Sequence, residues 1–160
     1  MRVGLGYDAH PLTAGRPLVL AGCAIPFDRG LDGYSDADVA CHAVIDALFG
    51  AAAIGDCGAH FPAGRPEFAN AVSLTLLARA STLVAEAGFR IANVDCTIVA
   101  EEPSLASHVD GMRTALAQAM DVEPARVSVK AKRTEGLGFV GEGRGMVAYA
   151  VACLEERPVE

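Results

Sequence analysis

The sequence of 160 residues lacks the features that mark membrane and exported proteins. No apolar run approaches the ~20 residues that a membrane-spanning helix requires, so we expect no membrane partner. Residues 1–4 lead directly into a strand-like pattern without the apolar core and cleavage site of a signal peptide. The odd number of cysteines, with no C-x-x-C pair, favours a reducing cytoplasm.

Paired cysteines and an excess of basic charge are also missing. The five cysteines are odd in number and no two have the C-x-x-C spacing, so we predict neither a disulfide framework nor a thiolate zinc site. Thirteen Lys and Arg residues against 20 Asp and Glu give a net charge of −7, which disfavours nucleic acid as a partner. There is no internal repeat or linker, and 52% apolar residues suffice for the core of one domain spanning residues 1–160.

Strands and helices are mixed along this one domain. The patterns predict strands over residues 2–8, 18–24, 94–100, 126–132 and 146–154, and helices over 35–53, 69–87 and 103–120, with loops over 55–66 and 136–145. This order predicts an α+β fold, an α/β sandwich in which helices cover one face of a mixed sheet.

Three residues suggest a metal site. Asp8 and His10 are two apart, so in a strand they share a face, and Pro11 is expected to end that strand. His42, from the following helix, would complete a set of three ligands, which leaves one position of a tetrahedral ion open for chemistry. Asp46, one helical turn later, could accept the spare ring N–H of His42. Taken singly, His42 also fits a buried histidine and Asp46 a solvated helix face.

Two further patterns concern anions. Lys130, Lys132 and Arg133 concentrate basic charge in four positions, which fits either an anion site or a solvated strand end. Residues 136–141 match G-x-G-x-x-G, but another strand follows instead of a long helix, so we reject a dinucleotide fold. A turn that brings backbone close to a phosphate and a plain hairpin both remain open.

Several linked motifs occur in one order along the chain. They are Gly4-x-Gly-Tyr-Asp8-Ala-His10, Ser35-Asp-Ala-Asp-Val-Ala-Cys-His42 continuing to Ala51, Gly55-Asp56-Cys-Gly58, Phe61-Pro62, Asn93-Val-Asp95, and Val129-Lys-Ala131 followed by Thr134-Glu135-x-Leu-Gly-Phe139. This set resembles the 2-C-methyl-D-erythritol 2,4-cyclodiphosphate synthase family essentially from end to end. Together the motifs are far more specific than any one alone.

The resemblance implies an enzyme of the non-mevalonate isoprenoid pathway. Members convert 4-diphosphocytidyl-2-C-methyl-D-erythritol 2-phosphate, a small cytidine diphosphate substrate, into the cyclic diphosphate and release CMP, a phosphorus–oxygen lyase reaction. They are homotrimers with active sites between subunits. The resemblance assigns one Zn²⁺ per subunit to Asp8, His10 and His42, and Mg²⁺ or Mn²⁺ to Glu135.

The resemblance also implies a set of substrate-binding residues. They are Asp8, His10, Ser35, Asp56, Cys57, Gly58, Phe61, Ala100, Ala131, Lys132, Thr134, Glu135 and Phe139. Asp56 and Gly58 match a loop that contacts ribose, and Ala100 and Ala131 lie in segments that form the cytidine pocket. Phe139 matches a residue of a cavity near the trimer axis.

The chain departs from the family at several of these positions. Tyr34 replaces a His, and the pair Lys132-Arg133 replaces two Thr residues. The resemblance assigns positions 34 and 133 a role in stabilising the transition state. Ser104 replaces a Lys, and Glu142 and Arg144 stand in swapped order. These changes leave two alternatives open: a non-catalytic trimeric protein that binds a nucleotide or isoprenoid diphosphate, and a zinc hydrolase.

Overall fold

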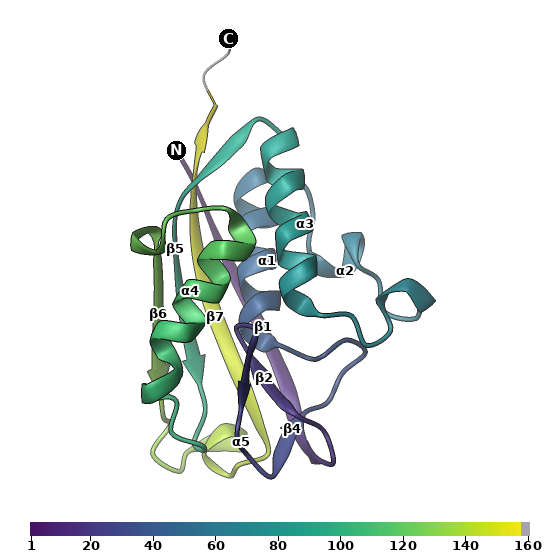
Figure 1. Cartoon of the computed structure of the whole chain (residues 1–160), viewed down its shortest axis with the longest axis vertical. Coiled ribbons are helices and arrows are strands. Elements are labelled where there is room, and N and C mark those ends of the chain that lie inside the picture. The colour runs from purple at the N-terminus through teal and green to yellow at the C-terminus, as the bar shows by residue number, and fades with distance from the viewer. Residues whose placement is uncertain (158–160) are drawn as a thin grey trace.

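A mixed five-stranded sheet forms the frame of the computed structural model, which describes residues 1–157 (Figure 1). Its strands are β1 (Arg2–Ala14), β4 (Arg29–Leu31), β5 (Phe89–Val99), β6 (Val127–Lys132) and β7 (Gly145–Glu156). The spatial order is β4-β1-β7-β5-β6. Only β5 and β6 are parallel, and the other neighbouring strands are antiparallel. A separate two-stranded sheet pairs β2 (Leu18–Leu20) with β3 (Cys23–Ile25).

Three helices cover one face of the central sheet: α1 (Val39–Ala52), α3 (Ser73–Glu86) and α4 (Val109–Met120) (Figure 1). Helix α1 packs on β1 and β7, α4 packs on β6, and α3 contacts both helices. The short helices are α2 (Cys57–His60), α5 (Gly138–Gly141), η1 (Pro66–Phe68), η2 (Ala106–His108) and η3 (Pro124–Arg126). Within residues 1–157, no helix combines the length and the apolar character needed to cross a bilayer.

Two glycines of β1 bring α1 into close contact with the sheet. A Cβ at Gly4 would lie 2.1 Å from the carbonyl oxygen of Ala47, and one at Gly6 would lie 1.8 Å from that of Ala43. Side chains alternate between the faces of a strand, so residues 4, 6, 8 and 10 all face the helix. The glycines let the helix backbone approach, and the two residues that continue the series reach the N-terminal end of α1.

No helix within residues 1–157 covers the opposite face of the sheet. Its exposed apolar side chains are Val3, Leu5, Tyr7, Tyr149 and Val151. Leu5 pairs with Val151, and Tyr7 with Tyr149, so these side chains form one continuous patch across β1 and β7. An apolar patch of this kind marks an interaction surface in soluble proteins.

The predicted fold class is confirmed: the chain is a single α+β domain with a mixed sheet and helices on one face. The predicted end of the first strand is wrong, because β1 continues through Pro11 to Ala14. The carbonyl oxygen of Pro11 accepts from the N–H of Asp32, and the carbonyl of Asp32, which has no N–H of residue 11 to bind, accepts from Nδ1 of His10 instead. The predicted strand 18–24 is a hairpin, since Ala21 and Gly22 adopt positive φ angles of 48° and 75° and reverse the chain.

The other boundaries shift by several residues. The helix predicted from residue 69 begins at Ser73, because Asn70 adopts a positive φ of 56° that a helix does not allow. The strand predicted from residue 94 begins at Phe89, and the helix predicted from residue 103 begins at Val109 after η2. The loop predicted over 55–66 contains the short helix α2. Asp56 caps the N-terminus of this helix, because its side chain accepts from the N–H of Ala59.

Candidate metal site and its surroundings

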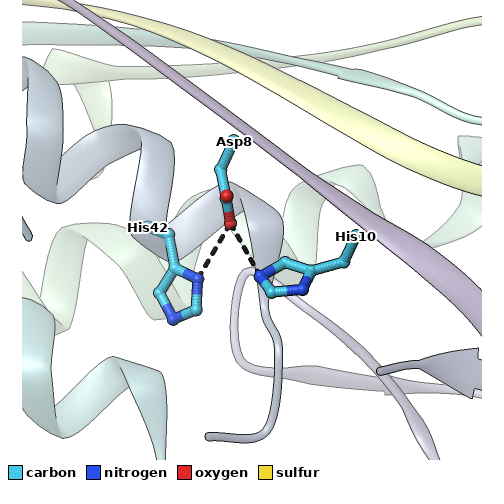
Figure 2. A group of neighbouring side chains, drawn as sticks. All are labelled: Asp8, His10 and His42. Atoms are coloured by element: carbon cyan, nitrogen blue, oxygen red, sulfur yellow. Dashed lines mark hydrogen bonds and ion pairs between the residues drawn. The ribbon is translucent and has the colours of Figure 1, made fainter. Parts of the chain in front are cut away.

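Asp8, His10 and His42 converge at the N-terminal end of α1 (Figure 2). Oδ2 of Asp8 lies 3.2 Å from Nε2 of His10 and 2.9 Å from Nδ1 of His42. The carboxylate therefore sits between the two rings, and all three side chains are partly buried. As expected, Asp8 and His10 share a face of β1 and lie next to His42 of α1.

A backbone carbonyl fixes the ring of His10. Nδ1 of His10 lies 2.6 Å from the carbonyl oxygen of Asp32. A carbonyl oxygen can only accept, so Nδ1 carries the proton and donates it. The lone pair of the neutral ring is then on Nε2, the nitrogen that faces Asp8, which is the arrangement that a metal-binding histidine requires.

The second ring nitrogen of His42 contacts two serines and not Asp46. Nε2 lies 3.0 Å from Oγ of Ser73 and 3.2 Å from Oγ of Ser35. Oδ1 of Asp46 instead accepts from the backbone N–H of Cys57 at 2.7 Å. The predicted bond between Asp46 and the ring is therefore not present, because the unpaired N–H at the start of α2 occupies this carboxylate.

The three side chains fit a divalent ion such as zinc. Tetrahedral ligands at bond lengths of about 2.0–2.1 Å are separated by about 3.3 Å, close to the distances of 2.9 and 3.2 Å between Asp8 and the two rings. Burial raises the pKa of Asp8, but the close contacts of its carboxylate with the rings of His10 and His42 outweigh burial and hold this pKa well below its usual range. The site thus presents an anionic oxygen and two imidazole nitrogens, a donor set typical of zinc.

The fully buried carboxylate of Asp38 anchors the start of α1. It accepts from the N–H groups of Ala40 and Cys41 in the first turn, and from those of Ala21 and Gly22 in the hairpin. Burial raises the pKa of Asp38, although the N–H groups of Gly22, Cys41 and Ala21 and the thiol of Cys41 act in the opposite direction. Asp38 thereby fixes the helix, and with it His42, relative to the hairpin.

Sequence reasoning missed Arg16, which binds the loop before α1. Its guanidinium donates to the carbonyl oxygens of Gly33 at 2.9 Å and Ser35 at 2.7 Å. The same loop supplies the Asp32 carbonyl to His10 and the Ser35 hydroxyl to His42. An arginine beside Gly15 and Pro17 in a turn carries no local pattern that identifies this role.

A second group of predicted residues lies where β5 and β6 end. The N–H of Ala100 donates to the carbonyl of Lys132 at 3.0 Å, and Nε of Arg133 donates to the carbonyl of Glu101 at 3.0 Å. Thr134 donates its N–H to the Glu101 carboxylate at 3.1 Å. Glu101, which sequence reasoning did not single out, therefore holds this turn. Ala131 is half-buried on the strand just before it.

Glu135 follows this turn but does not join the metal group. It is exposed, with a φ of 54°, and the three-residue cluster found within residues 1–157 does not include it. Phe139, in α5, lies close to that cluster, because it lines a hollow of about 290 Å³ together with His10 and Arg144. Arg144 pairs with Glu142 at 2.7 Å, so the swapped residues do form a salt bridge.

The remaining predicted residues lie around α2, before α1 and after β5. Cys57 and Gly58 form its first turn after Asp56, and Phe61, which is buried, packs against Phe49 and Phe68. The hydroxyl of Tyr34 donates to the carbonyl of Arg65 at 3.0 Å. Tyr34 thus ties the loop before α1 to the loop before α3. Ser104 is exposed beyond the end of β5.

The fold and the site define a single-domain α+β protein with a candidate metal site of three ligands. The chain belongs to the YgbB family, whose model matches residues 1–155. It is 55% identical over 157 residues to the 2-C-methyl-D-erythritol 2,4-cyclodiphosphate synthase of Dehalococcoides mccartyi. The alignment covers 98% of this chain and 100% of the relative.

Solved structures agree with this membership. The bifunctional IspDF from Campylobacter jejuni superimposes with a TM-score of 0.93 at 38% identity over 97% of this chain; the match spans 42% of that longer protein. A 2C-methyl-D-erythritol-2,4-cyclodiphosphate synthase in its CDP-bound form gives a TM-score of 0.88 at 33% identity, and covers 96% of this chain and 100% of that chain.

Proposed function

We propose that this protein converts 4-diphosphocytidyl-2-C-methyl-D-erythritol 2-phosphate into 2-C-methyl-D-erythritol 2,4-cyclodiphosphate and releases CMP. The observation that carries the proposal is the convergence of Asp8, His10 and His42 in a chain 55% identical to a synthase of that name over nearly its full length. The reaction belongs to isoprenoid biosynthesis. We place it in the cytoplasm, which suits the five free cysteines.

The chemistry needs no nucleophile from the protein, because the 2-phosphate of the substrate attacks the β-phosphorus. The structure offers no activated thiol here: burial, followed by the charges of Asp46, Asp8 and Asp56, raises the pKa of Cys57 to about 12. A divalent ion held by Asp8, His10 and His42 would polarise phosphoryl oxygens and favour in-line attack. The protein itself has to bind a flexible polyanion in a folded conformation.

The cytidine end of the substrate would bind at the ends of β5 and β6. Ala100 and Ala131 would flank the base there, and Lys132, Arg133 and Thr134 would face the phosphates. Glu135 would hold Mg²⁺ or Mn²⁺ with the diphosphate, since exposed carboxylates suit these ions. Asp56 and Gly58 would contact the ribose at the start of α2.

We also propose a homotrimer with active sites between subunits. The uncovered apolar patch that contains Leu5 and Tyr149 supports burial against further copies of the chain. Ala9 of β1 and Val99 of β5 are both level with Val147, so the metal group and the residues at the ends of β5 and β6 lie at the same end of the sheet. Strands β1 and β6 are three steps apart, about 14 Å at ~4.8 Å per step. In a trimer, the metal group of one subunit could lie closer to the ends of β5 and β6 of its neighbour.

A phosphorus NMR time course with substrate, zinc and magnesium tests the proposal. We expect the cyclic diphosphate and CMP to appear together, and Asp8→Ala and His42→Ala to abolish both products while the proteins stay folded. Asp110→Ala is the matched control, because this carboxylate is exposed on α4, far along the chain from the cluster. Near-normal turnover in Asp8→Ala and His42→Ala would refute the metal assignment. CDP binding without turnover would indicate a binding protein, and a linear product would indicate a hydrolase.

A further inference from the structure

Ser73 occupies a distinctive position beside the metal group. It is the first residue of α3, is fully buried, and lies 31 residues along the chain from His42. Its Oγ is 3.0 Å from Nε2 of His42, closer than the 3.2 Å of Ser35. The contact is made on the side of the ring that faces away from Asp8.

Asp36 decides which partner donates in this contact. Both the hydroxyl and the backbone N–H of Ser73 donate to the Asp36 carboxylate, the N–H at 3.0 Å. An ionised carboxylate accepts only, and a serine hydroxyl has one proton, which is therefore committed to Asp36. The Ser73 oxygen can then only accept from His42, so Nε2 of the ring must carry a proton. Nδ1 faces the Asp8 carboxylate at 2.9 Å, and a metal ion bound between them would replace the proton of this contact and take the lone pair of Nδ1.

The position of Ser73 is itself fixed by neighbouring backbone bonds. The N–H of Asp36 donates to the carbonyl of Ala71 at 3.1 Å, and the N–H of Asn70 donates to that of Tyr34 at 2.9 Å. These two bonds pair the segment before α1 with the segment before α3. The Asp36 carboxylate also satisfies an N–H at the start of α3, where a negative charge is favourable. The hydroxyl of Ser73 is thus held at a defined place relative to the ring.

We propose that Ser73, oriented by Asp36, is a positioning residue that fixes His42 with Nε2 protonated and thereby presents Nδ1 to the metal. This inference rests on the proposed metal-dependent function. Partners of this kind that bind the far side of a ligand typically contribute 10–100-fold to metal affinity. Ser35 remains as a weaker acceptor in a Ser73 variant, so we expect the lower end, about tenfold.

Two measurements test the role of Ser73 without reference to turnover. Chelator competition with zinc should show about tenfold weaker binding in Ser73→Ala, and weaker binding again in Ser35→Ala/Ser73→Ala, which removes both acceptors. Nitrogen-15 NMR of histidine-labelled protein should show a slowly exchanging Nε2–H of His42 that exchanges faster in Ser73→Ala. Asp36→Asn keeps the shape of the side chain but cannot accept at both atoms, and should show the same changes to a smaller extent.

Ser81→Ala is the matched control. This serine is on the same helix, and its hydroxyl donates to the carbonyl of Met120 at 2.9 Å, far from His42. Its zinc affinity and histidine spectrum should equal those of the unmodified protein. Unchanged zinc affinity and exchange in Ser73→Ala would overturn the inference alone, whereas failure of the unmodified protein to bind zinc would refute the proposed function. The Nε2–H of His42 in metal-free protein at pH 6 would still decide the contact with Ser73: its protection supports the contact and its absence overturns it.

Discussion

Replacing Gly6 by alanine should push α1 away from β1 and weaken the metal site. The new Cβ would lie 1.8 Å from the carbonyl oxygen of Ala43 and 2.7 Å from the backbone nitrogen of Ala47. Both neighbours are backbone atoms of a helix, so neither can rotate aside. Non-bonded heavy atoms prefer separations of about 3.5–4.0 Å, so the helix and strand must separate locally by more than about 1 Å.

This displacement has a predictable size in stability and in binding. Overpacking a core by one methyl group costs about 1–3 kcal/mol, and we expect the upper end because backbone must move. For a chain of this length, a loss of about 3 kcal/mol lowers Tm by roughly 6–12 °C. Asp8 is two residues beyond Gly6, and its distance of 2.9 Å to His42 spans the same interface. We therefore expect zinc affinity to fall at least tenfold, equivalent to about 1.4 kcal/mol.

Thermal unfolding followed by circular dichroism, and chelator competition with zinc, measure these two effects. Gly50→Ala is the matched control: Gly50 is in α1, and a Cβ there meets nothing within 4 Å. Alanine at that position should stabilise the protein by up to about 1 kcal/mol through helix propensity, without changing zinc affinity. If Gly6→Ala unfolds at the same temperature as the unmodified protein and binds zinc equally well, the close approach of α1 to β1 does not set the geometry of the site.

Three further predictions concern other parts of the molecule. Tyr34→Phe removes the bond to the carbonyl of Arg65, which is exposed and worth about 1 kcal/mol, so calorimetry should show a fall in Tm below about 4 °C; a larger fall would contradict this. Leu5→Asp, in a side chain 68% exposed, should leave the circular dichroism spectrum intact while sedimentation gives the 16.5 kDa of one chain; a trimer that persists would refute the proposed interface. Burial, followed by the charge of Asp46, raises the pKa of Cys57 to about 12, so its thiolate forms only near that pH. Mass spectrometry should therefore show slow alkylation of Cys57 by iodoacetamide at pH 8 in metal-free protein. Alkylation should be faster in Asp46→Asn, which removes the charge. Labelling at the rate of a free cysteine, whose pKa is about 8.5, would count against that account.

The sequence was sufficient to predict that the three candidate metal ligands lie together, because the placement of each depends on a local period. Asp8 and His10 share a face since strand side chains alternate, and that holds in β1 whatever the rest of the fold. His42 was placed on a helix by the apolar pattern that follows Asp38, the residue that caps it. The fold class followed for the same reason, from the order of segments with periods of 2 and 3.6.

What failed depended on contacts between segments distant in sequence. Helical spacing brought Asp46 near His42, but it could not show that the backbone of Cys57 binds this carboxylate first. The sequence also gives no sign of the contact between Ser73 and His42, because that contact requires the segment before α3 to pair with the segment before α1. The strand passes through Pro11 for a related reason: the carbonyl of Asp32 beside it accepts from the ring of His10, a contact that the local sequence does not reveal.

The motif Gly4-x-Gly6-x-Asp8-x-His10 therefore combines packing and chemistry in one strand face. Its first two members have no side chain so that α1 can approach, and its last two have side chains that reach the end of the same helix. Because the ligand distances depend on that approach, changes at the glycines should alter stability and metal binding together. Changes on the uncovered face, where Leu5 points away from the helix, should separate assembly from the metal site. The alternation of one strand thus divides the residues that build the site from those available to build an interface.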